Sequence, residues 1–297
     1  MKPAPFAYHR PATIGETVAL LAELAPLDGR ILAGGQSLVP MMAFRLATPA
    51  HLIDINRTAG LDTLAVGDGR LRIGAQVRHA AFHAPLAAPV AAPVAEGPLG
   101  RLLAAAVRHL AHYPIRLRGT FCGSLAHADP AAEWCAVAAT LDAEFVAVSQ
   151  RGERLIPAAD FFQGAMTTAL RSDELLAEAR LPLLPDDAHV GFAEFSRRPG
   201  DYALAMAVAV LRLEGGVVHE ARIGLGGAEA SPRRLAAAEA VLRGERLHEW
   251  LLRAAGAAAA GAIDPLEDPE TDAVYRRELV AAMVCRALGM AASEALA

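Results

Sequence analysis

Two loops built of small and hydroxyl residues constrain most strongly how this chain folds. The first is Ala33-Gly34-Gly35-Gln36-Ser37, and the second begins Gly119-Thr120-Phe121-Cys122-Gly123-Ser124. Residues without bulky side chains let backbone N–H groups close on an anion. Thr120, Ser124 and Glu133 add hydrogen-bond donors and acceptors, as a ligand with a phosphate and hydroxyl groups requires. We therefore expect the fold to bring both loops onto one diphosphate.

The second loop is predicted to run into a helix at Asp129. An acidic residue followed by a proline, here Pro130, is typical of an N-cap and a first helical position. The helix dipole would favour Glu133 in the first turn. We therefore expect a loop that leads into a helix capped by Asp129.

The N-terminal half alternates short strands with helices. Thr13 and Glu16 form a capping-box pattern before apolar residues at helical spacing, which predicts a helix over 11–24. G-x-G-x-x-G is absent, so the glycine loop at 33–37 is not a Rossmann fingerprint. The other predicted elements are strands 30–32 and 51–56, hairpins 64–66/71–73 and 144–148/153–156, and an apolar helix over 99–110.

A proline- and acid-containing segment at 182–187 is predicted to be a linker. After it, strands are expected at 192–196, 203–213 and 217–225, with Gly215-Gly216 as a turn. Helices are expected at 231–243, 247–261 and 271–288.

Composition excludes several classes of protein. The formal charge is −5 over 297 residues, which argues against nucleic-acid binding. The longest apolar runs, such as 202–211, are about half of a bilayer span. The start lacks the apolar core of a signal peptide, so we expect a cytoplasmic protein. Lys2 is the only lysine, which excludes a Walker A lysine and leaves no plausible Schiff-base lysine for pyridoxal phosphate.

Three cysteines, Cys122, Cys135 and Cys285, are scattered through the sequence and form no C-x-x-C pair. They cannot provide four thiolates for an iron–sulfur cluster or a zinc site within one chain. Any such cluster is therefore expected on another polypeptide.

The ordered set of motifs resembles the FAD-binding medium subunit of the molybdenum hydroxylases, the family of carbon monoxide dehydrogenase and xanthine dehydrogenase. Either glycine loop alone would be a weak signal. The resemblance covers nearly the whole chain and rests on 33–38, 118–120, 129–133, 160–162, 174–176, 197–204 and 275–277.

The resemblance implies an α+β fold with a two-lobed, PCMH-like FAD-binding domain and a C-terminal domain of antiparallel strands and helices. The expected divisions are 1–57 and 58–181 for the two lobes and 187–297 for the C-terminal domain. The implied function is electron transfer within a heterohexamer. A molybdopterin large subunit would oxidise the substrate, a [2Fe–2S] small subunit would pass on electrons, and FAD on this chain would deliver them to an external acceptor.

The resemblance also implies residue roles: Glu133 accepting from the ribityl hydroxyls, Asp129 beside the flavin, Tyr202 covering one face of the isoalloxazine ring, and Leu176 and Leu110 near flavin and adenine. Cys122 stands where the family usually has glycine, and Glu194 lies near a position where it often has lysine. No residue is expected to be catalytic. The expected cofactor-binding set is Ile31, Leu32, Ala33, Gly34, Gly35, Gln36, Ser37, Leu38, Leu110, Thr120, Cys122, Gly123, Ser124, Asp129, Glu133, Leu176 and Tyr202.

Two alternative functions remain open from the sequence. A self-sufficient FAD-dependent oxidase or dehydrogenase would need a base near flavin N5, and a nucleotide-binding scaffold would do no redox work. His79 and His83 stand four residues apart, but no third metal ligand is evident, and a solvated face is favoured. Ser37 lacks the closing glycine of a nucleophile elbow.

Overall fold

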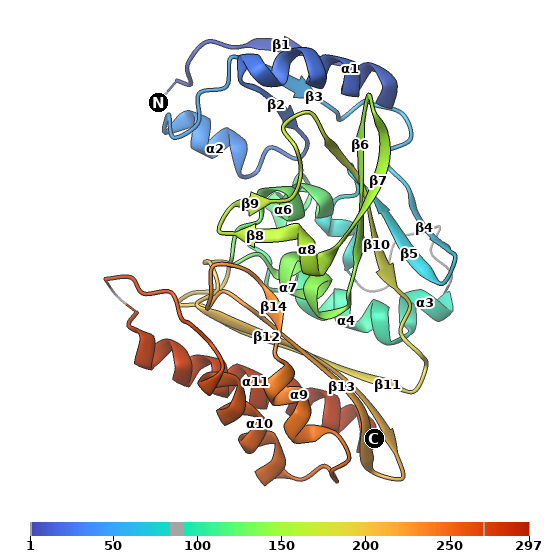
Figure 1. Ribbon diagram of the computed structural model, residues 1–297, viewed down its shortest axis with the longest axis vertical. Helices are drawn as coiled ribbons and strands as arrows, with labels where there is room; N and C mark the ends of the chain where they lie inside the picture. The colour runs from blue at the N-terminus through green and yellow to red at the C-terminus, as the bar shows by residue number, and fades with distance from the viewer. Residues whose placement is uncertain (1, 84–91, 270, 297) are drawn as a thin grey trace.

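The computed structural model describes residues 2–83, 92–269 and 271–296. Figure 1 shows three tiers along the long axis: a small lobe that contains the N-terminus, a central lobe built on a larger sheet, and a C-terminal sheet with helices on its outer face. This arrangement confirms the expected α+β architecture. Over the described residues, no helix combines the length and the apolar character needed to cross a bilayer.

The N-terminal lobe is a parallel sheet of three strands in the order β1-β3-β2, covered by helix α1. The capping-box prediction for α1 is confirmed, because the Thr13 hydroxyl accepts from the Glu16 N–H at 3.1 Å. The Glu16 carboxylate reaches back to the N–H of Ala12 at 2.7 Å, one residue before the cap. The elements are β1 (Ala7–His9), α1 (Ile14–Leu24), η1 (Ala25–Leu27), β2 (Gly29–Leu32), α2 (Leu38–Ala43) and β3 (His51–Asp54).

The central lobe is built on an antiparallel sheet in the order β4-β5-β10-β6-β7. Both predicted hairpins form, as β4/β5 and β6/β7. No strand was predicted for the middle strand, β10, which joins the two hairpins. The elements are β4 (Leu64–Gly67), β5 (Arg70–Gly74), η2 (His79–Phe82), α3 (Ala92–Glu96), α4 (Pro98–Val107), α5 (Tyr113–Arg116), α6 (Phe121–His127), α7 (Glu133–Thr140), β6 (Glu144–Ser149), β7 (Gly152–Pro157), α8 (Ala158–Phe161), β8 (Phe162–Gly164), β9 (Thr167–Thr168) and β10 (Leu175–Pro182).

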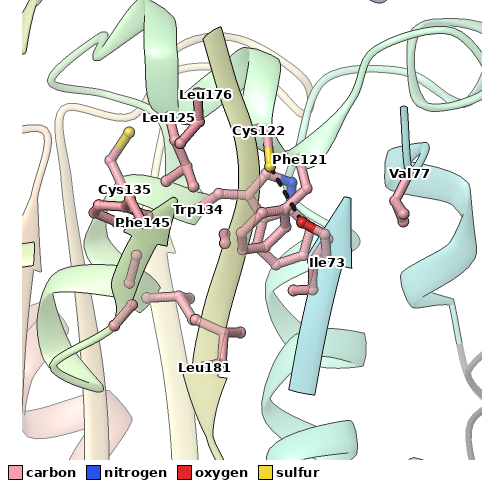
Figure 2. Close-up of a cluster of buried hydrophobic side chains, with 14 of the residues drawn as sticks. Ile73, Val77, Phe121, Cys122, Leu125, Trp134, Cys135, Phe145, Leu176 and Leu181 are labelled. Atoms are coloured by element: carbon pink, nitrogen blue, oxygen red, sulfur yellow. Dashed lines mark hydrogen bonds between the residues drawn. The ribbon is translucent and has the colours of Figure 1, made fainter. Parts of the chain in front are cut away.

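Aromatic packing fixes helices α6 and α7 against this sheet. Trp134 is fully buried, with its ring centroid 4.9 Å from that of Phe121 and 5.1 Å from that of Phe82. Figure 2 shows Trp134 and Phe121 beside Cys122, whose thiol donates to the carbonyl oxygen of Ile73 at 3.3 Å. Buried aromatic clusters of this kind supply much of a core's stability. The helices that carry the second loop are thereby held rigidly on the sheet.

The C-terminal sheet, in the order β11-β12-β13-β14, buries both faces. Side chains alternate between the faces of a strand. Val190 and Phe192 pack into the core of the central lobe, whereas Ala207 and Ala209 pack against the C-terminal helices. The strands are β11 (Ala188–Phe195), β12 (Ala205–Glu214), β13 (Val217–Gly226) and β14 (Arg233–Arg234), and the helices are α9 (Ala236–Leu242), α10 (Glu249–Gly261) and α11 (Ala273–Leu296).

The three C-terminal helices and the turn at Gly215-Gly216 form as predicted, with two changes of boundary. Helix α9 begins at Ala236 instead of residue 231, because Arg233–Arg234 pairs with β13 as strand β14. Helix α11 continues beyond the expected end at 288 to Leu296, where Glu294 accepts from Arg101 at 2.6 Å and from the N–H of Val190 at 2.8 Å. Tertiary contacts therefore set both boundaries.

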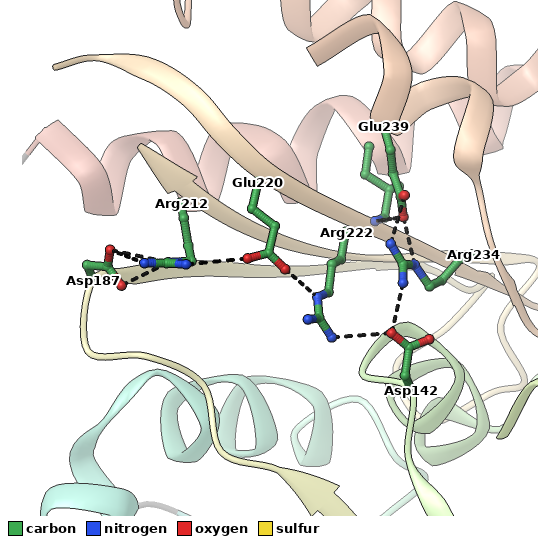
Figure 3. A network of polar contacts seen from close by, with 8 residues as sticks. Asp142, Asp187, Arg212, Glu220, Arg222, Arg234 and Glu239 are labelled. Carbon is green, nitrogen blue, oxygen red and sulfur yellow. Dashed lines mark hydrogen bonds and ion pairs between the residues drawn. The ribbon is translucent and has the colours of Figure 1, made fainter. Parts of the chain in front are cut away.

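Ion pairs join the loop after α7 to the C-terminal sheet (Figure 3). The Asp142 carboxylate lies 2.8 Å from Arg234 and 3.4 Å from Arg222. Arg234 also binds the buried Glu239 of α9 at 2.8 Å. Exposed ion pairs contribute little individually, but a network fixes geometry. This network helps to fix the orientation of the C-terminal sheet relative to α7.

The C-terminal sheet packs closely on α7 at Gly224 of β13, where a Cβ atom would lie 1.6 Å from Thr140 Oγ1 of α7. We predict that Gly224→Ala lowers the free energy of unfolding by about 1–3 kcal/mol through overpacking. Thr140→Ala in the same chain should restore part of this loss, which a double-mutant cycle by urea denaturation measures. Gly289→Ala, with open space around its Cβ position, is the control. Equal effects of the two glycine substitutions would contradict the prediction.

Candidate functional site

The two glycine loops meet in space although they are distant in the sequence. A Cβ atom on Gly34 would lie 2.4 Å from the carbonyl oxygen of Arg118 and 2.5 Å from Gly119 Cα. Only glycine permits so close a backbone approach. Beside this contact lies a hollow of about 330 Å³, lined by Ala33, Gly34, Asp54, Asn56, Arg78, Leu117 and Arg118.

The first loop presents open hydrogen-bond donors. Among the residues that the structure describes, none accepts from the backbone N–H groups of residues 34–37. Gly35 adopts a φ of +73°, which turns the chain directly after β2 and leads it into α2. Consecutive N–H groups without protein partners are the usual lining of a phosphate site. This loop therefore has the form that was expected of an anion cradle.

The second stretch is not the loop that was predicted. Helix α6 begins at Phe121, and the Thr120 hydroxyl caps it by accepting from the N–H of Gly123 at 3.1 Å. The N–H of Ser124 donates to the Thr120 carbonyl, and that of Phe121 to the carbonyl of Val77. Most of the donors here are thus used within the protein. The small residues make room for the first loop instead of leaving N–H groups open.

The prediction that Asp129 caps the following helix is wrong. Helix α7 begins at Glu133 with Ala132 at the N-cap position. The Asp129 carboxylate instead accepts from the N–H of Ala131 at 2.9 Å, closing a turn. The carbonyl of Pro130 accepts from the N–H of Gly227 at 2.7 Å. This hydrogen bond to the C-terminal domain holds the segment as a turn.

The hollow contains side chains that sequence reasoning did not identify. Arg78 donates to the Asn56 side chain at 2.5 Å and to the carbonyl of Arg118. Asn56 in turn donates to the carbonyl of Ala33 at 2.8 Å. Burial and the nearby Arg118 charge lower the pKa of Arg78. Two guanidinium groups outweigh the one carboxylate, Asp54, beside this hollow and favour an anionic ligand. Of the two arginines, only Arg118 belongs to the motifs on which the sequence resemblance rests.

His79 is a structural residue of the core, so the expectation that it lies on a solvated face is wrong. Its Nδ1 atom accepts from the Trp134 indole at 2.9 Å, and burial lowers its pKa to about 3, so the imidazole is neutral. A Cβ atom on Gly119 would lie 2.5 Å from its Nε2 atom. The imidazole therefore forms the back wall of the second stretch, and His83 does not join it in a metal site.

A second group of predicted residues gathers where the central lobe meets the C-terminal domain. Tyr202 lies on the loop between β11 and β12 and is 74 % exposed. Partial loss of hydration and the charges of Asp129 and Glu133 raise its pKa, so these acids lie within electrostatic reach of its hydroxyl. The neighbouring Gly200 packs on His112, since a Cβ atom there would lie 2.4 Å from the imidazole.

Glu133 is an acid held in an apolar surrounding at the start of α7. It is 8 % exposed, and burial, followed by the charge of Glu194, raises its pKa to about 8 while Arg116 opposes the shift. Arg116 itself donates to the backbone carbonyls of Arg108, Leu110 and Ala111. A neutral carboxyl at this position can both donate and accept hydrogen bonds.

Three of the remaining predicted residues are buried, and Ile31, Leu32 and Leu38 are partly buried. Cys122, Leu110 and Leu176 are between 2 % and 7 % exposed, and burial raises the pKa of the Cys122 thiol. Cys122 lies inside α6, where its backbone needs no special φ. Ile31 and Leu32 end strand β2, and Leu38 begins helix α2 after the first loop.

Comparison with known proteins identifies the family to which this arrangement belongs. Residues 4–184 match the family described as FAD binding domain in molybdopterin dehydrogenase. The chain belongs to this family. Residues 191–291 match the CO dehydrogenase flavoprotein C-terminal domain. The chain is therefore an FAD-binding oxidoreductase subunit, and the resemblance found in its sequence is confirmed.

Curated relatives extend along the whole chain. The nicotine 6-hydroxylase medium subunit of Paenarthrobacter nicotinovorans is 38% identical over 288 residues, 97% of this chain and 98% of the relative. The carbon monoxide dehydrogenase medium chain of Hydrogenophaga pseudoflava is 34% identical over 291 residues, covering 98% of each chain. Both are medium subunits or chains of larger enzymes.

Solved structures show the same fold. A chain of quinoline 2-oxidoreductase from Pseudomonas putida 86 superposes with a TM-score of 0.92 at 36% identity and covers 100% of both chains. A chain of the Hydrogenophaga pseudoflava carbon monoxide dehydrogenase superposes with a TM-score of 0.91 at 36% identity and covers 99% of both.

The contact between the loops predicts a large effect of one methyl group. Gly34→Ala should reduce FAD retention at least tenfold, because the Cβ atom would push the first loop away from Gly119. The flavin content of purified protein, measured by absorbance after denaturation, checks this. Gly261→Ala, with no atom within 4 Å of its Cβ position, should leave the flavin content unchanged. Full flavin content in a folded Gly34→Ala protein would show that the contact is not needed.

Burial of Glu133 predicts a pH-dependent stability of the protein without FAD. Its folded pKa of about 8 lies above the unfolded value of roughly 4.3, so its contribution is fully present below the unfolded value and is lost as pH rises through the folded value. Relative to Glu133→Gln, the wild type should lose roughly 1.4 kcal/mol per pH unit between these values. Urea denaturation at pH 5 and pH 8 measures the difference. A stability difference independent of pH would contradict it.

Proposed function

We propose that this chain is the medium subunit of a molybdenum hydroxylase that receives electrons from a [2Fe–2S] small subunit and passes them to an external acceptor. A molybdopterin large subunit would hold the organic substrate. The names of relatives support this assignment, since they include the nicotine 6-hydroxylase medium subunit and the carbon monoxide dehydrogenase medium chain. The observation that carries the proposal is the open row of N–H groups at residues 34–37 facing the second loop.

We also propose the assignment of binding residues. Residues 34–37 would hold the FAD diphosphate with their backbone N–H groups, while Thr120, Gly123 and Ser124 shape the opposite wall. The hollow beside them, with Arg78 and Arg118, supplies positive charge. The other members of the proposed set are Ile31, Leu32, Ala33, Leu38, Leu110, Cys122, Asp129, Glu133, Leu176 and Tyr202.

The chain's own groups would bind and orient the flavin and limit its contact with water. Glu133 would exchange hydrogen bonds with the ribityl hydroxyls, and Tyr202, exposed in the protein without cofactor, would cover one face of the ring. When bound, FAD supplies a carrier that can take up electrons singly and release them in pairs. The protein's part is to set the position and the electrostatic environment of this carrier.

The proposed domain divisions follow the sheets. Residues 1–57 contain the parallel sheet, residues 58–181 contain almost the whole five-stranded sheet, and residues 187–297 contain the C-terminal sheet with its helices. The two families match on either side of the linker, at 4–184 and 191–291. The proposed flavin-ring site lies where the second and third of these units meet.

Reconstitution of the purified chain tests the proposal. The single chain should bind about one FAD and be reduced by dithionite, but it should oxidise no organic substrate until the iron–sulfur and molybdenum subunits are added. A titration monitored at the visible flavin bands measures binding and reduction, and a dye-coupled assay measures turnover. Turnover by the single chain, free of molybdenum and iron, would favour the self-sufficient flavoenzyme. A chain that binds no FAD would reject both functions.

A further inference from the structure

Glu194 on β11 is a buried acid that the proposed binding set does not include. Its side chain is 2 % exposed, and its Oε2 atom has no hydrogen-bond partner among the described residues. Period-two alternation places it on the same face as Val190 and Phe192, which pack toward the central lobe. A buried polar atom without a partner costs free energy in the protein alone. The presence of a glutamate at this buried position points to a hydrogen-bond partner that a ligand supplies.

The groups around Glu194 do not neutralise its charge. His109, after α4, places its Nδ1 atom 3.9 Å from Glu194 Oε1, too far for a hydrogen bond. Arg116 of α5 donates to three backbone carbonyls, and no carboxylate of the described residues lies within ion-pair distance of it. Glu133 of α7 contributes a second acid, with Asp129 beyond it.

The other elements packed on β11 add no cation at this position. The β12 residue opposite Glu194 is Met206. Helix α11 packs on the opposite face of the strand, where Gly191 lies against Ala287. Burial therefore decides the ionisation of the acid and raises the pKa of Glu194 to about 7. Below that pH the side chain is a neutral carboxyl, which can donate a hydrogen bond.

We propose that Glu194 is an FAD-binding residue that donates a hydrogen bond to the bound cofactor from its protonated carboxyl group. This inference rests on the proposed function, because Glu133, which marks the flavin end of the proposed site, lies within electrostatic reach of Glu194. The cofactor would supply the hydrogen-bond partner that Glu194 Oε2 lacks in the protein alone. An ionised carboxylate at the same place would present only acceptors, so it could not pair with the acceptor atoms of the flavin, its carbonyl oxygens and unprotonated ring nitrogens.

The proposal fixes the sign of a pH dependence. If the cofactor binds only the protonated acid, the Kd for FAD is constant well below pH 7 and rises up to about tenfold per pH unit above it. Binding at pH 8 must also take up about one proton, because most of the free protein is then ionised at Glu194. This proton uptake can be measured on the wild-type protein, without any substituted variant.

The experiment measures FAD binding to flavin-free protein by quenching of flavin fluorescence between pH 5.5 and pH 8.5. We expect the rising Kd in the wild type and a flat curve in Glu194→Gln, whose amide keeps an N–H donor and does not titrate. Glu194→Ala should bind at least tenfold more weakly at pH 6. Glu133→Gln should keep the pH dependence, which separates the two acids. Glu214→Gln removes one exposed charge from the far end of β12 and is the matched control.

Each contrary outcome is distinct. A Kd that falls with rising pH would show a carboxylate acceptor and overturn the proposal, as would a Glu194→Gln protein with the wild-type pH dependence. If Glu194→Gln fails to fold, as judged by circular dichroism, the proton uptake of the wild type at pH 8 decides: no uptake overturns the proposal. Tight FAD binding with a flat wild-type curve removes only this inference. Absence of FAD binding at every pH instead rejects the proposed function.

Discussion

The burial of helix α7 between the two domains is the constraint on which the rest of the structure depends. Every residue of α7 is buried, and it contacts α4 and α6 on one side and β12, β13 and β14 on the other. Gly224 of β13 permits the close approach of the sheet to the C-terminal end of α7. The hydrogen bond between Pro130 and Gly227 fixes the turn before the N-terminal end of α7. The same helix carries Trp134, whose indole orients His79 behind the second loop. The position of one short helix thus sets both the stretch that faces the first glycine loop and the junction that holds Glu133.

Burial at this junction has an electrostatic consequence. Glu133 and Glu194 come from different domains, yet the charge of Glu194 adds to the effect of burial on Glu133, and burial raises the pKa of both toward or above neutrality. Replacing either acid by an apolar residue of similar size would remove the cost of burying an ionisable group. Hence the pair is better understood through what it does for a ligand than through its effect on stability. Asp142, which also lies at the domain contact, is by contrast matched by Arg222 and Arg234.

Local signals in the sequence predicted much of the fold, and the failures have identifiable tertiary causes. The capping box at Thr13, the hairpin at Asp68-Gly69 and the turn after β2 depend on residues close in sequence, and all three form. Helix α6 was missed because glycine at position 123 weakens the helical pattern, whereas packing of Phe121 on Trp134 supports the helix. Strand β10 was missed because its partners, β5 and β6, lie far away in the sequence. Within the site, the glycine loops were visible, but Arg78 and Asn56 were not, since only the fold carries them to the hollow.

The two loops, similar in composition, have opposite physical roles. The second uses its small residues for packing: Gly119 fits against His79, Gly123 sits beside its capping hydroxyl, and most backbone donors are already bonded. The first leaves its donors open and relies on the second to hold it in place through the contact between Gly34 and Gly119. Because the wall that faces the row of unpaired donors is already formed, less conformational entropy is lost when a ligand binds. Under the proposed function, the FAD diphosphate would satisfy the donors that the protein leaves open and would thereby complete the contact between the lobes.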